Sequence, residues 1–172
     1  MLIFFLFSCE KEKSLFKFLD SSETGIQFVN KITESDQLNP LTFEYIYNGA
    51  GVGVADFNND GLTDVYLAGN QVSGELYLNK GEMHFENITE LSKTKTTTWC
   101  TGVSIIDINQ DGWQDIYLST ISPIANKSTA NILYINQKND KNGIPIFKEM
   151  AAEVGLADSS YATQATFFDY DL

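Results

Sequence analysis

The chain has 172 residues, of which 43% are hydrophobic and 13% aromatic, values typical of one folded domain rather than of a disordered segment. Its formal net charge is −12, and all 11 of its Lys and Arg residues are Lys. This balance argues against the phosphate-binding surface that nucleic-acid-binding proteins build from clustered Lys and Arg, so no nucleic-acid partner is expected. It favours a protein that binds cations.

The amino terminus begins with an apolar run, residues 1–7, that ends in Ser8 and Cys9 and is followed by four charged residues. The run is too short to span a bilayer but has the length of the apolar region of a signal peptide. The stretch LFSC at residues 6–9 resembles a bacterial lipobox, in which the Cys becomes the lipid-carrying amino terminus.

This resemblance implies a lipoprotein signal at residues 1–9, lipidation at Cys9 and a linker at residues 10–23. The protein would then be exported and held to a membrane by its lipid, in the periplasm or at the outer-membrane surface. No basic residue precedes the apolar run. That absence leaves open a start upstream of Met1, or an apolar run of another origin.

Residues 24–50 precede the first clear motif and contain two runs that predict strands, at 24–28 and 43–47. We interpret this region as the divergent leading strands of an earlier repeat. The cysteines, Cys9 and Cys100, are too few for a disulfide framework and too far apart for a zinc ribbon. Cys100, beside Trp99, is expected to be a small buried apolar residue.

An internal repeat organises the rest of the chain. GVGVADFNNDGLTDVYL at 51–67 aligns with GVSIIDINQDGWQDIYL at 102–118, LYLN at 76–79 with LYIN at 133–136, and FENIT at 85–89 with FKEMA at 147–151. ATFFDYD, which begins at Ala165, opens a third copy. The repeats are placed at 51–101 and 102–162, and the start of the third at 163–172.

Each repeat predicts four short strands, and a period of 50 to 60 residues is typical of β-propellers. The predicted class is therefore all-β, with blades of four-stranded antiparallel sheet. Helical turns are expected only at 88–91 and 150–154. Closed propellers have at least about four blades, so we interpret the chain as about two blades plus the edges of a larger propeller.

The acidic loop of each repeat, DxNxDGxxD, carries oxygen side chains at positions 1, 3, 5 and 9. Gly at position 6 allows a sharp turn, position 7 can offer its carbonyl, and position 4 (Asn59 or Gln110) is expected to face solvent. Such an all-oxygen set suits Ca²⁺. An EF-hand would need Glu at position 12, where Leu67 and Leu118 stand. The alternative is an Asx-rich turn without metal, which the repetition of the motif disfavours.

These motifs resemble the FG-GAP or VCBS repeat, as found in the seven-bladed propeller of integrin α-subunits. Together with YIYNGAGV at 45–52 and TQATFFDYD at 163–171, they are most similar to bacterial VCBS-repeat lipoproteins that often carry an ASPIC/UnbV domain. The resemblance covers residues 24–172 and implies calcium ligands in two complete loops and a partial third. The implied ligands are Asp56, Asn58, Asp60, the Leu62 carbonyl and Asp64; Asp107, Asn109, Asp111, the Trp113 carbonyl and Asp115; and Asp169 and Asp171.

The expected function is a non-catalytic, calcium-stabilised extracellular module that binds or adheres to a protein or glycan. The chain has a single His, no nucleophile elbow, no Gly-rich phosphate loop and no acid pair outside the acidic loops, so we expect no enzyme activity. The alternative is an accessory or appended module of a polysaccharide-processing enzyme or uptake system; nucleic-acid binding is the least favoured alternative.

Overall fold

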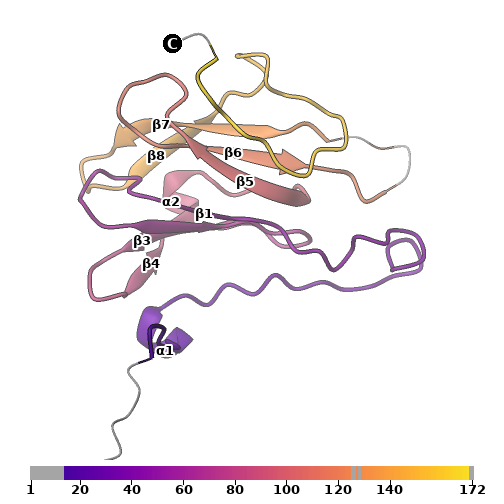
Figure 1. Cartoon of the computed structure of the whole chain (residues 1–172), viewed down its shortest axis with the longest axis horizontal. Coiled ribbons are helices and arrows are strands. Elements are labelled where there is room, and N and C mark those ends of the chain that lie inside the picture. The colour runs from indigo at the N-terminus through magenta and orange to yellow at the C-terminus, as the bar shows by residue number, and fades with distance from the viewer. Residues whose placement is uncertain (1–13, 125–126, 128, 171–172) are drawn as a thin grey trace, which may run out of the picture.

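Two four-stranded antiparallel sheets form most of the regular structure in the computed structural model, which describes residues 14–124, 127 and 129–170 (Figure 1). Sheet 1 contains β1 (Val52–Ala55), β2 (Asp64–Leu67), β3 (Glu75–Asn79) and β4 (Phe85–Asn87). Sheet 2 contains β5 (Cys100–Ile106), β6 (Asp115–Thr120), β7 (Ile132–Asn139) and β8 (Pro145–Glu149). In both sheets the strands lie in chain order, which confirms the predicted all-β class.

The two sheets share one register, which confirms the repeat alignment. Gly53 pairs with Tyr66 in sheet 1, and Ser104 pairs with Tyr117 in sheet 2, an offset of 51 residues on both strands. The match extends outward, because Tyr66 also pairs with Leu76 as Tyr117 pairs with Leu133. The inserted residues of the second repeat lie in the β6–β7 connection and in the extended outer ends of β7 and β8, and they leave this pairing unchanged.

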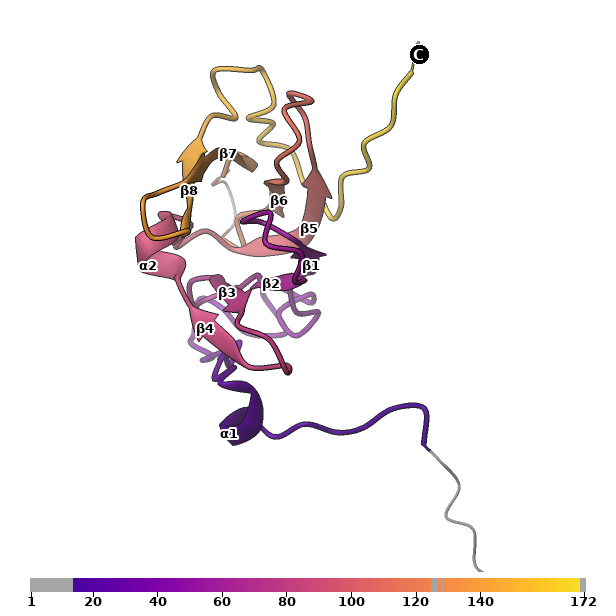
Figure 2. The ribbon, with the colours of Figure 1, turned by 90° about the vertical axis from the view of Figure 1, so that its left-hand side faces the viewer.

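The core lies between the sheets, which stack as two layers (Figure 2). It is formed mainly by buried side chains of both sheets: Phe57, Tyr66, Leu76, Leu78, Cys100, Val103, Ile116, Leu118, Tyr134 and Phe147. Cys100 is a free, fully buried thiol, as expected, and its burial raises its pKa to about 12. The inner strands β1 and β5 approach closely because Gly51 and Gly53 face Val103 and Ile105 without a side chain between them.

Two short helices flank this core. Helix α2 (Thr89–Ser92) follows β4 and lies beside both β3 and β8 (Figure 2), close to the helical turn predicted at 88–91. Helix α1 (Ser21–Thr24) was not predicted, although Asp20 and Glu23 form a capping box. The Asp20 side chain accepts from the Ser22 backbone N–H, and the Glu23 side chain accepts from the Asp20 backbone N–H. No helix in the described part of the chain has the length and apolar character needed to cross a bilayer.

The strands predicted at 24–28 and 43–47 are wrong, because neither segment joins a sheet. Residues 26–32 are extended and alternate between partly buried and exposed, but the backbone N–H groups of Ile26 and Gln27 donate to the hydroxyls of Thr24 and Tyr77 and not to a neighbouring strand. Phe43 and Ile46 are both buried from within a series of turns, at a spacing of three residues instead of two. The spacing of buried side chains could be inferred from the sequence. Whether a neighbouring strand pairs with these segments could not.

The segment 162–167, at the start of the third copy, runs alongside β5 without forming a strand. Ser104 Oγ donates to the Ala165 carbonyl at 2.6 Å, and Gln164 Nε2 donates to the Val103 carbonyl at 3.0 Å. The Phe167 ring packs edge-on against Tyr117, with 5.3 Å between centroids. Sheet 2 is therefore enclosed between sheet 1 and this segment.

Candidate metal centres

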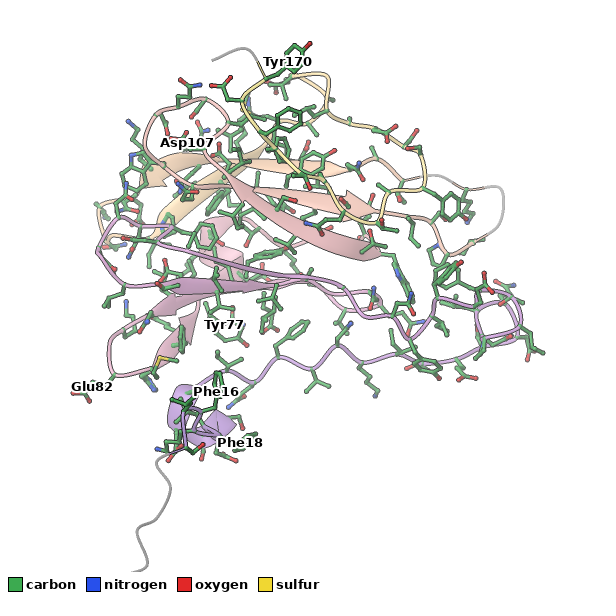
Figure 3. All side chains as sticks on the ribbon, in the orientation of Figure 1. Phe16, Phe18, Tyr77, Glu82, Asp107 and Tyr170 are labelled. Atoms are coloured by element: carbon green, nitrogen blue, oxygen red, sulfur yellow. The ribbon has the colours of Figure 1, made fainter. Side chains whose placement is uncertain are left out.

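The two acidic loops connect β1 to β2 and β5 to β6, so both lie at the same end of the stacked sheets. Figure 3 shows Asp107 at this end, opposite the turns that precede β1. Each loop therefore begins where an inner strand ends and returns directly into the neighbouring strand.

The first Asp of each loop holds the turn closed in the same way. Asp56 accepts from the backbone N–H groups of Asp60 and Gly61 at 3.0 and 2.7 Å. Asp107 accepts from those of Asp111 and Gly112 at 3.0 and 2.8 Å. The closed turn requires left-handed backbone at the glycine, with φ of 87° and 82°, which confirms the role predicted for position 6.

The ninth residue of each loop is a fully buried carboxylate. Asp64 accepts from the backbone N–H of Phe57, at the start of its own loop, and from that of Asn79 on β3, both at 2.8 Å. Asp115 accepts from Ile108 at 3.1 Å and from Asn136 on β7 at 2.7 Å. Each carboxylate thus links three chain segments: the loop entry, the following strand and the third strand of the sheet.

Burial raises the pKa of Asp64 to about 6 against the lowering effect of its two backbone hydrogen bonds, and the negative charges of Asp60 and Asp56 raise it further. The pKa of Asp115 is raised for the same reasons, with Asp111 and Asp107 as the neighbouring charges. The three carboxylates of each loop are therefore close enough to repel one another. A bound cation would convert this repulsion into attraction.

The middle residues of the loops form a second set of matched contacts. Asp60 accepts from the Leu62 N–H at 2.8 Å, and its own N–H donates to Asn58 Oδ1 at 3.3 Å. In the other loop the corresponding distances are 3.0 Å for Trp113 to Asp111 and 3.2 Å for Asp111 to Asn109. These bonds close the loop on itself.

Within the described residues, no three His, Cys, Asp or Glu side chains are grouped so that they could hold a metal ion. The donor types nevertheless fit a hard cation, because each loop supplies only carboxylate, amide and carbonyl oxygens. Asp60 and Asp111 are exposed and can rotate, whereas Asp64 and Asp115 are fixed by burial. Calcium binding would therefore require the exposed carboxylates to turn inward toward the buried one.

Of the remaining predicted site residues, the structure describes only Asp169. Asp169 is exposed in a segment without regular structure. Asp171 and Cys9 lie outside the described residues. The third calcium site and the lipid anchor stay predictions.

Sequence reasoning missed the contacts that join the first loop to β7 of sheet 2 and to the second loop. Asn136 Nδ2, on β7, donates to the Phe57 carbonyl at 2.8 Å, and Asn139 Nδ2 donates to the Asn58 carbonyl at 2.8 Å. Asn59, expected only to face solvent, is exposed but also donates to the Gly112 carbonyl at 3.2 Å. The Asn that ends both LYLN and LYIN is the sequence feature from which a bond between the third strand and an acidic loop could have been predicted.

A comparison with curated proteins found no match. A scan against protein families found one for residues 37–118, described as an FG-GAP-like repeat. This range contains sheet 1, both acidic loops, and sheet 2 as far as Leu118 on β6. The part of the chain that holds the duplicated loop is therefore similar to an FG-GAP-like repeat.

Proposed function

We propose that this chain is a calcium-stabilised, extracellular β-propeller-like module that binds a protein or glycan and performs no catalysis itself. The FG-GAP-like repeat at residues 37–118 supports an extracellular propeller-like module. The observation that carries the calcium part is the duplicated loop. Both copies hold a fully buried Asp of raised pKa beside two other carboxylates.

Calcium in this proposal has a structural role. In the first loop its ligands are Asp56, Asn58, Asp60, the Leu62 carbonyl and Asp64. In the second loop its ligands are the residues at the equivalent positions. A divalent ion supplies the positive charge that these carboxylates lack. It would hold the loop entry against the adjoining strand and relieve the repulsion that destabilises the ionised form of the buried Asp.

Membrane attachment completes the proposal. A lipid on Cys9 would place the module outside the cytoplasm, where free calcium is abundant enough to fill weak sites. The support for it is the lipobox-like LFSC stretch. The test is metabolic labelling with a lipid precursor, which we expect to label the protein and to be abolished by Cys9→Ala.

The calcium proposal is tested by thermal unfolding of the full chain in calcium and in chelator. At a concentration 100 times Kd, one site adds about 2.7 kcal/mol, which for this size raises Tm by about 5–10 °C. The double variant Asp60→Asn, Asp111→Asn preserves side-chain shape and is expected to lose this calcium-dependent rise.

The matched control is Asp140→Asn. Asp140 is also an exposed Asp that accepts turn N–H groups, from Asn142 and Ile144, but it lies in the β7–β8 connection, outside both acidic loops. It should keep the full calcium response. A wild-type Tm that is the same in calcium and chelator would disprove the calcium proposal.

A further inference from the structure

An aromatic pocket of about 530 Å³ lies at the end of the sheets opposite the acidic loops. Four segments form it: the turns before β1, the residues at the start of β5, the residue that follows β6, and the segment at the start of the third copy of the repeat. Its size falls within the usual range for small-molecule sites. Because it draws on three successive repeats, the pocket belongs to the assembled module and to no single sheet.

Four aromatic side chains shape the pocket. Phe43 and Trp99 are buried and pack edge to face, with 5.5 Å between ring centroids. Tyr45 and Tyr161 also line it but are 55% and 72% exposed. The Tyr161 hydroxyl donates to the Ser122 carbonyl at 3.3 Å, which restrains its ring. The pocket therefore combines a fixed apolar wall with two tyrosine rings open to solvent.

The polar groups of the pocket are uncharged and several lack a partner. Among the described residues, none of those that line it is Asp, Glu, Lys, Arg or His, although the chain carries a net charge of −12. Among the residues that line the pocket, Trp99, Asn48 and Thr163 make no side-chain hydrogen bond within the described part of the chain, and Asn48 and Thr163 are exposed to solvent. These groups can donate to, and in the last two cases accept from, a ligand.

A neutral polyhydroxylated ligand matches this combination. The C–H faces of a sugar ring pack on aromatic rings, while its hydroxyls bond to amide, hydroxyl and indole groups. An anionic ligand would meet a strongly acidic protein with no cation among the lining residues. A cationic ligand would find no carboxylate among them, and the nearby Glu44 carboxylate already accepts from the Tyr45 hydroxyl. An entirely apolar segment would leave the three polar groups unpaired.

We propose that this pocket binds a neutral sugar unit of a glycan chain, an inference that rests on the proposed binding function and names its ligand class. Tyr45 and Tyr161 supply the stacking surfaces. Asn48, Thr163 and Trp99 supply the hydrogen bonds that orient the ring. The acidic loops, at the other end of the sheets, take no direct part in recognition.

The test is calorimetric titration of the full chain, in calcium, with cellohexaose, laminarihexaose, xylohexaose and maltohexaose, and with hexagalacturonic acid as the acidic comparison. We expect at least one neutral hexasaccharide to bind and the acidic one to bind more weakly or not at all. Tyr161→Ala should weaken binding about three- to tenfold, because one exposed stacking surface is removed.

Tyr170→Ala is the matched control, since Tyr170 is 88% exposed and does not line the pocket (Figure 3). It should bind as the wild type does. The inference is overturned if no neutral hexasaccharide binds, if the acidic one binds more tightly, or if the two Tyr variants bind alike. Binding of an apolar dye that no sugar displaces would instead identify an apolar docking surface.

The two proposals fail separately. A chain whose Tm rises with calcium but which binds none of these sugars disproves the glycan inference alone. A chain that binds a sugar through Tyr161 and shows no calcium response disproves the calcium proposal alone.

Discussion

Sheet 1 and sheet 2 have the same strand order, register and acidic loop, yet they differ in what covers their inner strands. β5 lies between β1 and the segment 162–167, and its Val103 is only 8% exposed. In the described part of the chain β1 packs against β5 on one side, and its Val52, at the position equivalent to Val103, is 60% exposed. Equivalent residues therefore have different burial because of neighbouring repeats and not because of their own sequence.

The acidic loops show the opposite behaviour. Their hydrogen bonds agree within a few tenths of an ångström between the repeats, although their surroundings differ. Each loop is closed mainly by its own backbone and by one strand of its own sheet. The comparison separates local structure, which repeats with the motif, from packing, which depends on position in the array.

The largest expected effect tests the equivalence of the loops. Asp64→Ala should lower the free energy of unfolding by about 2–4 kcal/mol, because two buried N–H groups lose their acceptor. Asp115→Ala should have the same or a slightly smaller effect, since the bond from Ile108 is longer and only partly buried. Urea denaturation measures both. A loss below about 0.5 kcal/mol for either variant would show that the loop does not depend on this carboxylate.

A second prediction concerns the close approach of the two sheets. In Gly51→Ala the new Cβ would lie 2.6 Å from the Val103 backbone nitrogen, so the sheets must shift apart. We expect a loss of about 1–3 kcal/mol in urea denaturation. Val52→Ala, on the same strand but at a mostly exposed side chain, is the control and should change stability by less than about 0.5 kcal/mol. Equal effects would contradict the packing argument.

The smallest effect distinguishes two tyrosines at equivalent positions. Tyr117 donates to the Leu156 carbonyl at 3.0 Å and accepts from Asn131 at 2.9 Å. The Tyr66 hydroxyl is buried and has no hydrogen-bond partner in the described residues, and burial raises its pKa well above the usual value. The tyrosine hydroxyl at this position therefore has hydrogen-bond partners in sheet 2, and in sheet 1 it has none among the described residues.

Tyr117→Phe is therefore expected to lose about 1 kcal/mol, whereas Tyr66→Phe should be neutral or stabilise the protein by up to about 1 kcal/mol. Thermal or urea unfolding of the two variants, side by side, measures the difference. Equal destabilisation by both substitutions would show that Tyr66 bonds to an ordered water, and the contrast between the sheets would then disappear.

Sequence reasoning succeeded where contacts are local or repeated. The strands around DFNNDGLTD and DINQDGWQD, the turn at each loop glycine and the burial of Cys100 follow from neighbouring residues and from comparison of one repeat with the next. It failed for residues 24–50, where an alternating pattern indicated strands. Alternation reports one buried side of an extended chain, and it says nothing about whether a backbone partner lies alongside.

The sequence by itself determined the all-β class, the repeat, and the oxygen-rich loops, because each depends on residues within a few positions of one another. Only the tertiary structure decided which inner strand is covered, how Asn136 and Asn139 of β7 bind the first loop, and that aromatic residues from three connections meet in one pocket. These features join residues far apart in the chain. Their proximity depends on how the sheets pack, which no single motif encodes.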